Sequence, residues 1–407
     1  MRIAIFTETF IHKNTAAANQ AAVLQKGLQQ LGHKVLIVTG STKATEIILD
    51  KGMLCCPASK SNNFYRQSAN KIYAHMLDYY IGAFKPDVLH ILTMSEIGMA
   101  GLRFGQKNHV PIISTVHEFH NAQQLDGEQS LQQIFSLIMQ PLAQRHAQKI
   151  LSHSQIVTYS SRQLVSHIKE YAPKAKIIRI PYCVNDVKFR MYGISEQACW
   201  EMKERLRLKP DDTGVIFAGQ LYKNNNVDQL LYYWKKCVKS TDTLRLIIAG
   251  DGPQMNYLKN LALEYGIMSQ VTFTGELSQE ELNTCFAVCD VFVSATGSMT
   301  MKASPLEAIA CGVPVIIPKK SANADIVIEG QNGFTYENPI DMYRLMRNFT
   351  NMSSRQRAYL RTLVSKTAER LTPASQAETI LKLYLSLKRN SNIVQKKNRK
   401  YDWYSND

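Results

Sequence analysis

The sequence predicts an α/β protein with two doubly wound domains, each a parallel sheet covered by helices on both faces. Three observations support this fold class. Short runs rich in Val, Ile and Leu alternate with longer amphipathic stretches, as strands and helices do in a parallel sheet. The runs are apolar at consecutive positions, which is typical of strands buried on both faces. The pattern restarts near residue 180, so the 407 residues hold two domains within the usual range of about 100–200 residues each.

The first half of the chain predicts one series of alternating strands and helices. The expected strands are Arg2–Phe6, Lys34–Thr39, Asp87–Leu92, Pro111–Val116, Ile156–Tyr159 and Lys176–Ile180. The expected helices are Ala16–Leu31, Asn70–Ala83, Glu96–Gln106 and Leu131–Ala147. Residues 1–187 are therefore assigned to an N-terminal domain.

The second half repeats the alternation over residues 188–372. The expected strands are Gly214–Ala218, Leu244–Ala249, Val271–Thr274, Val291–Ser294 and Val313–Ile317. The expected helices are Val227–Val238, Gln254–Tyr265, Glu280–Ala287, Pro305–Cys311, Arg355–Leu371 and Ala374–Leu387. Ser278 and Glu281 have the spacing of a capping box at the start of the third of these helices. Residues 373–388 are expected to form a helix that crosses back to the N-terminal domain, and residues 389–407 a loose basic tail.

Composition and charge narrow the function. The 48 Lys and Arg exceed the 33 Asp and Glu by 15, which favours a phosphate-bearing partner: nucleic acid, an anionic membrane or a phosphorylated small molecule. Nucleic acid is not expected, because no zinc finger, RRM signature or recognition-helix pattern occurs. The eight cysteines form no CxxC pair, and the acids and histidines form no ligand-spaced cluster, so no metal or cofactor is expected. No run approaches the ~20 apolar residues of a membrane span, and the opening MRIAIFTETF is expected to be a buried strand, not a signal peptide.

A glycine turn and a histidine mark two candidate sites. Gly250 and Gly252 follow an apolar strand and precede a helix, where backbone N–H groups can approach a phosphate. A plain strand-to-helix turn explains the same glycines. His117 follows the strand PIISTV at its carboxyl end, where α/β proteins bind ligands. The alternative is a structural histidine that hydrogen-bonds within a turn to Glu118 or His120.

A third candidate is Glu307, which opens a helix after the small residues Ala303 and Ser304. Its carboxylate can accept hydrogen bonds from ribose hydroxyls while the preceding backbone N–H groups face a diphosphate. The alternative is a first-turn glutamate that only complements the helix dipole.

Together these segments resemble family 4 glycosyltransferases over more than 300 residues. The segments that carry the resemblance are MRIAIFTETF, GLQQLGHKVLIVT, FKPDVLHIL, VPIISTVHEFH, IPYCVNDVKF, IIAGDGP, DVFVSA and SPLEAIACGVPVI. Within the family, the FTETF opening and VFVSA are most similar to bacterial enzymes that glucosylate diacylglycerol. The resemblance implies two Rossmann-like domains facing a cleft (the GT-B fold), with an N-terminal acceptor-binding domain and a C-terminal nucleotide-sugar-binding domain. It also implies a hexosyltransferase that moves a sugar with retention from a nucleotide-sugar, expected to be UDP-linked, to a lipid or glycan acceptor.

The resemblance assigns roles to the candidate residues. His117 matches a catalytic histidine near the reacting sugar and acceptor, and Glu307 matches a glutamate that holds the donor ribose. Other residues that fall on the donor side are Gly250, Gly252, Lys223, Ala303 and Ser304.

Four positions depart from the family pattern. Ala16 replaces a glycine near the donor phosphates, Gln220 and Asn225 replace the Arg and Lys that neutralise the leaving diphosphate, and Met299 replaces the first glutamate of the E-x7-E pattern. Loss of one such contact costs ~3–4 kcal/mol of transition-state stabilisation. Lys302, in the same loop as Met299, is a hypothetical replacement cation. Two functions therefore stay open: an active glycosyltransferase with a modified donor site, or a catalytically silent relative that binds a protein partner as co-activator or scaffold.

The positive charge suggests where the protein acts. Basic residues lie beside aromatic ones in the segment KSNNFYRQSANKIY and again in the tail before Trp403 and Tyr404. Further basic residues of the N-terminal domain are Arg162, Lys169, Lys174, Lys176 and Arg179. Lysine and arginine near interfacial aromatics favour an anionic membrane surface. The sequence thus predicts a cytoplasmic protein held peripherally on the inner face of the cell membrane.

Overall fold

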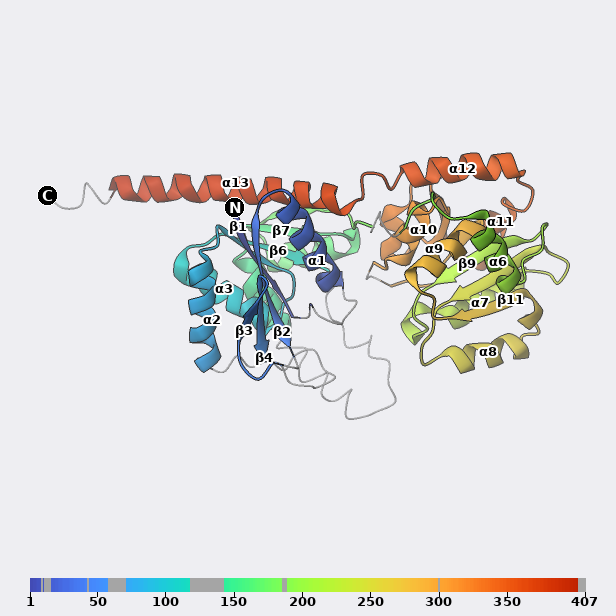
Figure 1. Ribbon diagram of the computed structural model, residues 1–407, viewed down its shortest axis with the longest axis horizontal. Helices are drawn as coiled ribbons and strands as arrows, with labels where there is room; N and C mark the ends of the chain where they lie inside the picture. The colour runs from blue at the N-terminus through green and yellow to red at the C-terminus, as the bar shows by residue number, and fades with distance from the viewer. Residues whose placement is uncertain are drawn as a thin grey trace. The chain divides into compact units, whose positions relative to one another are not determined.

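The computed structural model describes residues 1–8, 10, 16–41, 44–57, 71–117, 143–184, 189–298 and 301–401, with side chains except at 71–74 and 390–401. The chain forms two compact units. The first contains Met1–Pro181 and Pro373–Asp407, and the second contains Tyr182–Thr372. Each unit has a central sheet with helices packed on it (Figure 1).

The first unit is built on an eight-stranded sheet in the order β3-β4-β2-β1-β5-β6-β7-β8. Its strands are β1 (Arg2–Thr7), β2 (Lys34–Ser41), β3 (Ile48–Asp50), β4 (Met53–Pro57), β5 (Val88–Ile91), β6 (Ile112–Val116), β7 (Ile156–Tyr159) and β8 (Lys176–Arg179). All neighbours are parallel except β3 and β4. This antiparallel pair is a hairpin through Lys51 and Gly52, both at positive φ, the geometry of a tight primed turn.

Helices cover both faces of this sheet. They are α1 (Ala16–Gln30), α2 (Lys71–Phe84), α3 (Glu96–Asn108), α5 (Val165–Tyr171) and α13 (Pro373–Tyr401), and residues 143–152 are also helical. Successive residues of β1 belong to different hydrophobic clusters: Ala4 and Phe6 pack with residues of α2 and α3, whereas Ile3 and Ile5 pack with α1 and α13. The strand is thus buried on both faces, as its continuous apolar run predicts.

The second unit holds a six-stranded parallel sheet in the order β11-β10-β9-β12-β13-β14. Its strands are β9 (Thr213–Ala218), β10 (Leu244–Ala249), β11 (Val271–Gly275), β12 (Val291–Val293), β13 (Val315–Pro318) and β14 (Gly333–Tyr336). Its helices are α6 (Glu196–Leu206), α7 (Val227–Cys237), α8 (Met255–Glu264), α9 (Gln279–Val288), α10 (Ser304–Ala310), α11 (Pro339–Arg347) and α12 (Ser354–Lys366). The capping box predicted for Ser278 and Glu281 is present at the start of α9.

The strand order reverses direction once in each unit. In the second unit the chain runs outward from β9 through β10 to β11, then returns to the other side of β9 as β12. The first unit does the same around β1, with β2 on one side and β5 on the other. Open α/β sheets bind ligands at the carboxyl ends of strands beside such a reversal. The predicted fold class, two Rossmann-like parallel α/β domains, is confirmed.

The last helix extends further than the sequence predicts. α13 crosses α1 so closely that a Cβ on Gly27 would lie 2.5 Å from the Cβ of Ala377. The predicted loose tail from residue 389 is wrong as far as Tyr401, because α13 continues to that residue. Its only Pro is at its first position and it contains no Gly, so no residue type that ends helices occurs inside it. Among the described helices, none is long and apolar enough to cross a membrane.

Candidate active site

His117 lies directly after β6, at the carboxyl edge of the first unit's sheet. Only 8% of the residue is exposed, and burial lowers its pKa to about 4. The imidazole is therefore neutral at pH 7 and has one donor and one acceptor nitrogen. Glu118 and His120, its alternative partners, lie outside the described residues, as does the predicted basic segment 60–70.

A second buried histidine lies beside it. His90 on β5 is fully buried, and burial together with the proximity of His117 lowers its pKa to about 3. Its Nδ1 lies 2.7 Å from the Tyr384 hydroxyl of α13, and its Nε2 lies 2.7 Å from the Thr115 hydroxyl of β6. The Thr115 hydroxyl is also 2.6 Å from that of Thr158 on β7. Sequence reasoning missed this set, because no short-range pattern links residues on β5, β6, β7 and the last helix.

In the second unit, backbone hydrogen bonds join the loops after β9, β10 and β11. Gly219 N donates to Ala249 O at 2.9 Å, Leu221 N donates to Asp251 O at 2.9 Å, and Gln254 N donates to Leu221 O at 3.1 Å. Gly250 N donates to the carbonyl of Gly275 at 2.9 Å. These bonds fix the backbone at the carboxyl edge of the sheet, where the predicted donor residues lie.

The two glycines of the predicted phosphate turn pack against protein backbone. A Cβ on Gly250 would lie 2.0 Å from Gly219 O, and one on Gly252 would lie 2.8 Å from Leu221 N. Both have positive φ, +143° and +157°, which side chains disfavour. The close approach of the neighbouring loop therefore explains why glycine is needed here, as the strand-to-helix alternative requires. A phosphate-binding role for this turn remains a prediction.

Gln220 and Asn225, which replace the expected Arg and Lys, have different surroundings. Asn225 is 8% exposed, and its Nδ2 donates to the carbonyl of Gln220, so this position braces the loop after β9. The side chain of Gln220 itself is exposed, as is Lys223 at the start of the short helix Lys223–Asn225. Thr296 ties the same loop to the segment after β12, since its hydroxyl donates to Asn224 O at 3.0 Å.

Glu307 occupies the first turn of α10, whose N-cap residue Ala303 provides no side-chain cap. Burial alone raises the pKa of this carboxyl from 4.5 to about 7. Glu307 is partly exposed, and its carboxyl has no hydrogen-bond partner among the described residues. A desolvated carboxyl in this state is suited to accept hydrogen bonds from a ligand.

The loop before α10 is fixed by one asparagine. Asn323 accepts from Lys302 N at 2.9 Å and donates to Lys302 O at 2.8 Å. Met301, which precedes Lys302, is buried, and Ala322 N donates to Ser298 O at 2.8 Å. Met299 lies outside the described residues. Ala16, in the first unit, is the first residue of α1 and has no positive φ.

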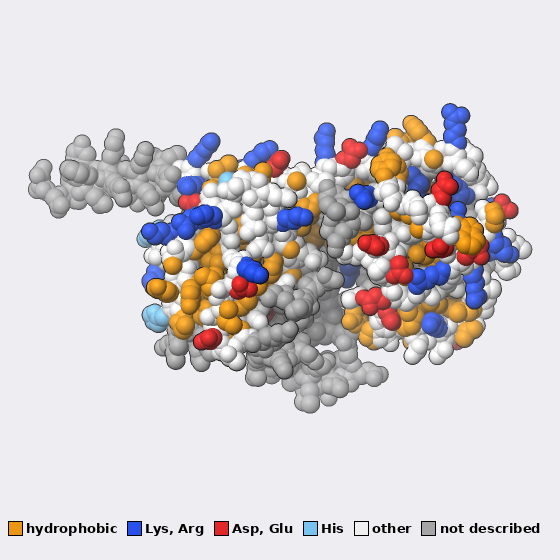
Figure 2. Space-filling model, viewed as in Figure 1, with side chains coloured by type: hydrophobic (Ala, Val, Ile, Leu, Met, Phe, Trp, Pro, Cys, Tyr) orange, Lys and Arg blue, Asp and Glu red, His pale blue; other side chains and the backbone are white. Residues whose placement is uncertain are grey.

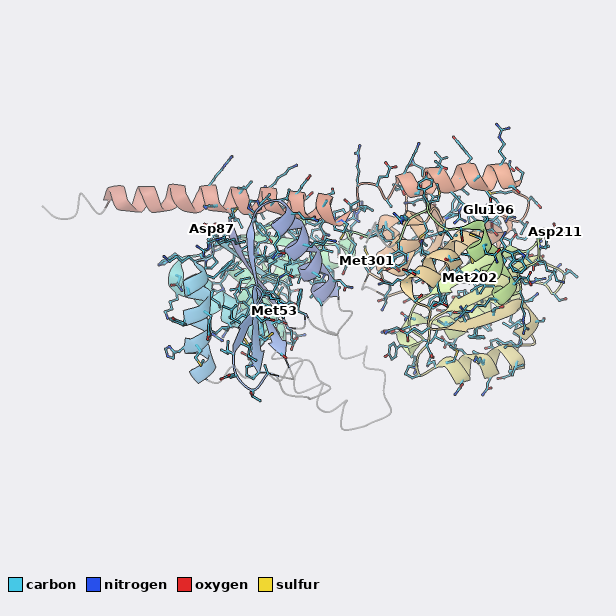
Figure 3. All side chains as sticks on the ribbon, viewed as in Figure 1. Met53, Asp87, Glu196, Met202, Asp211 and Met301 are labelled. Atoms are coloured by element: carbon cyan, nitrogen blue, oxygen red, sulfur yellow. The ribbon has the colours of Figure 1, made fainter. Side chains whose placement is uncertain are left out.

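A cavity of 780 Å³ lies at the opposite edge of the second unit, lined by residues that precede β9, β10 and β12. Figure 3 shows Met301 and Asp211, a lining residue, at opposite ends of the unit. Three aspartates of the cavity lining are paired with arginines: Asp212 with Arg245 at 3.2 Å, Asp242 with Arg347 at 2.9 Å, and Asp290 with Arg357. No predicted site residue lines this cavity. No group of three His, Cys, Asp or Glu in the described parts of the chain is placed to hold a metal ion.

Known protein families match both halves of the chain. The chain matches the family described as "Glycosyltransferase Family 4" over residues 17–188 and the one described as "Glycosyl transferases group 1" over residues 199–393. It is 24% identical to the alpha-monoglucosyldiacylglycerol synthase of Streptococcus pneumoniae, over 78% of this chain and 70% of that protein. The enzyme of the same name from Acholeplasma laidlawii is 22% identical over 98% of this chain and 99% of that protein.

Solved structures share the fold. Sucrose-phosphate synthase from Thermosynechococcus elongatus superposes with a TM-score of 0.73 at 17% identity, covering 95% of this chain and 98% of that one. Anabaena HepE in complex with UDP gives 0.72 at 12% identity, covering 95% and 100%. The fold and the matched families define a two-domain glycosyltransferase of the GT-B type. The chain belongs to glycosyltransferase family 4, resembles the diacylglycerol glucosyltransferases, and is a hexosyltransferase.

Proposed function

We propose that the protein transfers a sugar, with retention, from a UDP-linked donor to a membrane lipid or glycan acceptor. The observation that carries the proposal is the Glu307 carboxyl, which is desolvated and without a partner among the described residues, at the carboxyl edge of the second unit's sheet. Two relatives are named as synthases of a glucosylated diacylglycerol, and one structural neighbour binds UDP. These names support a lipid acceptor and a uridine nucleotide.

In this proposal the second unit, with predicted bounds 188–372, binds the donor. Glu307 accepts hydrogen bonds from the ribose hydroxyls, and the loop with Ala303 and Ser304 faces the diphosphate. The turn with Gly250 and Gly252 lies along the nucleotide. The first unit binds the acceptor, and neutral His117 orients the reacting sugar against it.

The chemistry requires positive charge at the leaving group. A departing UDP gains negative charge in the transition state, and cationic side chains stabilise it. Gln220 and Asn225 carry no charge, so this role falls to Lys223 and to Lys302, whose backbone Asn323 fixes. Asn225 also favours the second candidate function, a catalytically silent protein that binds a partner. At the position where the family pattern has a Lys that neutralises the diphosphate, Asn225 instead hydrogen-bonds to the carbonyl of Gln220.

Membrane attachment belongs to the first unit in this proposal. The outer strand β8 and the neighbouring α5 carry Lys176, Arg179 and Lys169. Figure 2 shows Lys and Arg side chains projecting from the face of this unit that α13 covers. Each basic residue near an anionic surface contributes about 1 kcal/mol, which supports a peripheral position on the inner face of the cell membrane.

Calorimetric titration with UDP and UDP-glucose tests the proposal. We expect saturable binding for the wild type and at least tenfold weaker binding for Glu307→Gln, whose amide cannot accept with a carboxylate's strength. Glu264→Gln is the matched control, because this glutamate is exposed on α8. Failure of the wild type to bind any uridine nucleotide at millimolar concentration would favour the silent candidate.

A further inference from the structure

A fully buried polar chain crosses the core of the first unit. It runs from the Tyr384 hydroxyl on α13 to the His90 imidazole on β5, and on to the Thr115 hydroxyl on β6, with 2.7 Å at each step. Thr158 on β7 ends it at 2.6 Å. Each of the four residues is at most 4% exposed. Its hydrogen bonds thus join α13 to three adjacent strands.

Stability alone does not account for this chain of buried hydrogen bonds. Apolar residues of the same shape in place of both partners of a buried hydrogen bond are nearly neutral for stability or favourable. The cluster that contains Tyr384 also contains Ile3, Ile5, Val88 and Ile113, so an apolar side chain at position 384 would meet apolar neighbours. A complete buried network does provide rigidity, because each partner restricts the orientation of the next.

This chain of hydrogen bonds includes Thr115 of β6, which lies two residues before His117. β6 ends at Val116, and His117 follows it directly, so Thr115 is held by hydrogen bonds only two residues before His117. His90 belongs to the same neighbourhood, since its pKa responds to His117. The hydrogen bonds of Thr115 therefore restrain the carboxyl end of β6, from which the proposed catalytic histidine follows.

We propose that Tyr384, His90 and Thr115 are positioning residues that hold the end of β6, and with it the His117 imidazole, in its reactive orientation. This inference rests on the role of His117 in the proposed function. None of the three residues is assigned a contact with the substrate. Tyr384 differs from the other two residues because it lies on the last helix. The proposed catalytic histidine that it helps to position lies in the first half of the chain.

Tyr384→Phe tests the role of these hydrogen bonds, because it removes the hydroxyl that bonds to His90 and keeps the ring. We expect kcat to fall about three- to tenfold, as the loss of one net hydrogen bond predicts, with KM for the nucleotide-sugar unchanged. Thr115→Val should give the same split. Ile380→Val is the matched control: it lies one turn earlier on the same buried face of α13, lowers stability slightly and should leave kcat unchanged. Equal kcat for Tyr384→Phe and Ile380→Val would overturn the proposal.

A double-mutant cycle shows whether Tyr384 acts through His117. In a His117→Ala background, Tyr384→Phe should slow the residual transfer no further, because the positioned group is gone. A further loss equal to that in the wild type would overturn the proposal.

Titration of the histidine Cε1–H signals by NMR is independent of activity. In Tyr384→Phe the pKa of His117 should move toward the ordinary histidine value, and in Ile380→Val it should not. If His117→Ala keeps wild-type kcat, the proposed function of His117 fails. The NMR titration still decides the positioning chain, and an unchanged His117 signal in Tyr384→Phe refutes it.

Discussion

Glu307→Gln should make the protein more stable while it weakens donor binding. Burial raises the pKa of this carboxyl from 4.5 to about 7, and one pKa unit corresponds to about 1.4 kcal/mol. The folded state binds the proton more tightly than the unfolded state, so the ionised carboxyl lowers stability as pH rises from about 4.5 to about 7. The cost is about 1 kcal/mol at pH 5 and about 3 kcal/mol at pH 8.

Glutamine has no such cost, so the variant's advantage must depend on pH. Urea unfolding at pH 5 and pH 8, followed by the fluorescence of buried Trp234 in the second unit, measures both values. We expect Glu307→Gln to exceed the wild type by about 3 kcal/mol at pH 8 and by about 1 kcal/mol at pH 5. Exposed Glu264→Gln should change neither. A difference that is equal at the two pH values, or a variant less stable at pH 8, would refute this account of Glu307.

The same pKa predicts a proton change on donor binding. At pH 7 the Glu307 carboxyl is about half protonated, and ribose hydroxyls that donate to it favour the ionised form. UDP binding should therefore release about half a proton at pH 7. Calorimetry in buffers of different ionisation enthalpy measures this number, and zero release would contradict a carboxylate–ribose contact.

Three further changes test other parts of the structure. Gly250→Ala should cost more than about 3 kcal/mol of stability in a thermal melt, because its Cβ would meet Gly219 O at 2.0 Å. Gly266→Ala is the control: a Cβ there would have no neighbour within 4 Å, so it should cost about 1–2 kcal/mol. Gln220→Arg should tighten UDP binding about tenfold by calorimetry, because the guanidinium would add a charge-assisted hydrogen bond. Equal UDP affinity for Gln220→Arg and the wild type would count against a diphosphate beside residue 220. Asn225→Lys should instead destabilise the fold. The fraction bound to anionic vesicles should fall between about 0.1 and 1 M salt, as the screening length shortens from about 10 to 3 Å, and equal recovery in sedimentation would exclude electrostatic attachment.

The fold was readable from the sequence because its inner strands are buried on both faces. All six residues of β9 are buried, and the short length and β-branched content of such runs distinguish them from buried helices. The hairpin of β3 and β4 was missed because β3 is a three-residue strand that is wholly exposed. The end of α13 was missed because its polar, basic composition resembles a tail, while helix length depends on the absence of breakers.

The candidate site was only partly readable. His117 and Glu307 were located by their place after a strand and at the start of a helix, which local pattern reveals. The contact between Gly250 and Gly219 depends on the close packing of two loops, and the hydrogen bond between His90 and Tyr384 joins residues 294 apart in the chain. No local spacing predicts either contact, since the tertiary fold brings these residues together.

Sugar transfer to lipid is the most direct measurement. The protein is incubated with UDP-[14C]glucose and vesicles that contain diacylglycerol and anionic phospholipid, and the glycolipid product is quantified and its anomeric configuration determined. We expect an α-linked product, as retention of the donor's configuration requires, and a loss of about 100-fold in His117→Ala. A β-linked product, or no transfer from any UDP-hexose by wild-type protein that is folded and bound to the vesicles, would contradict the proposed function.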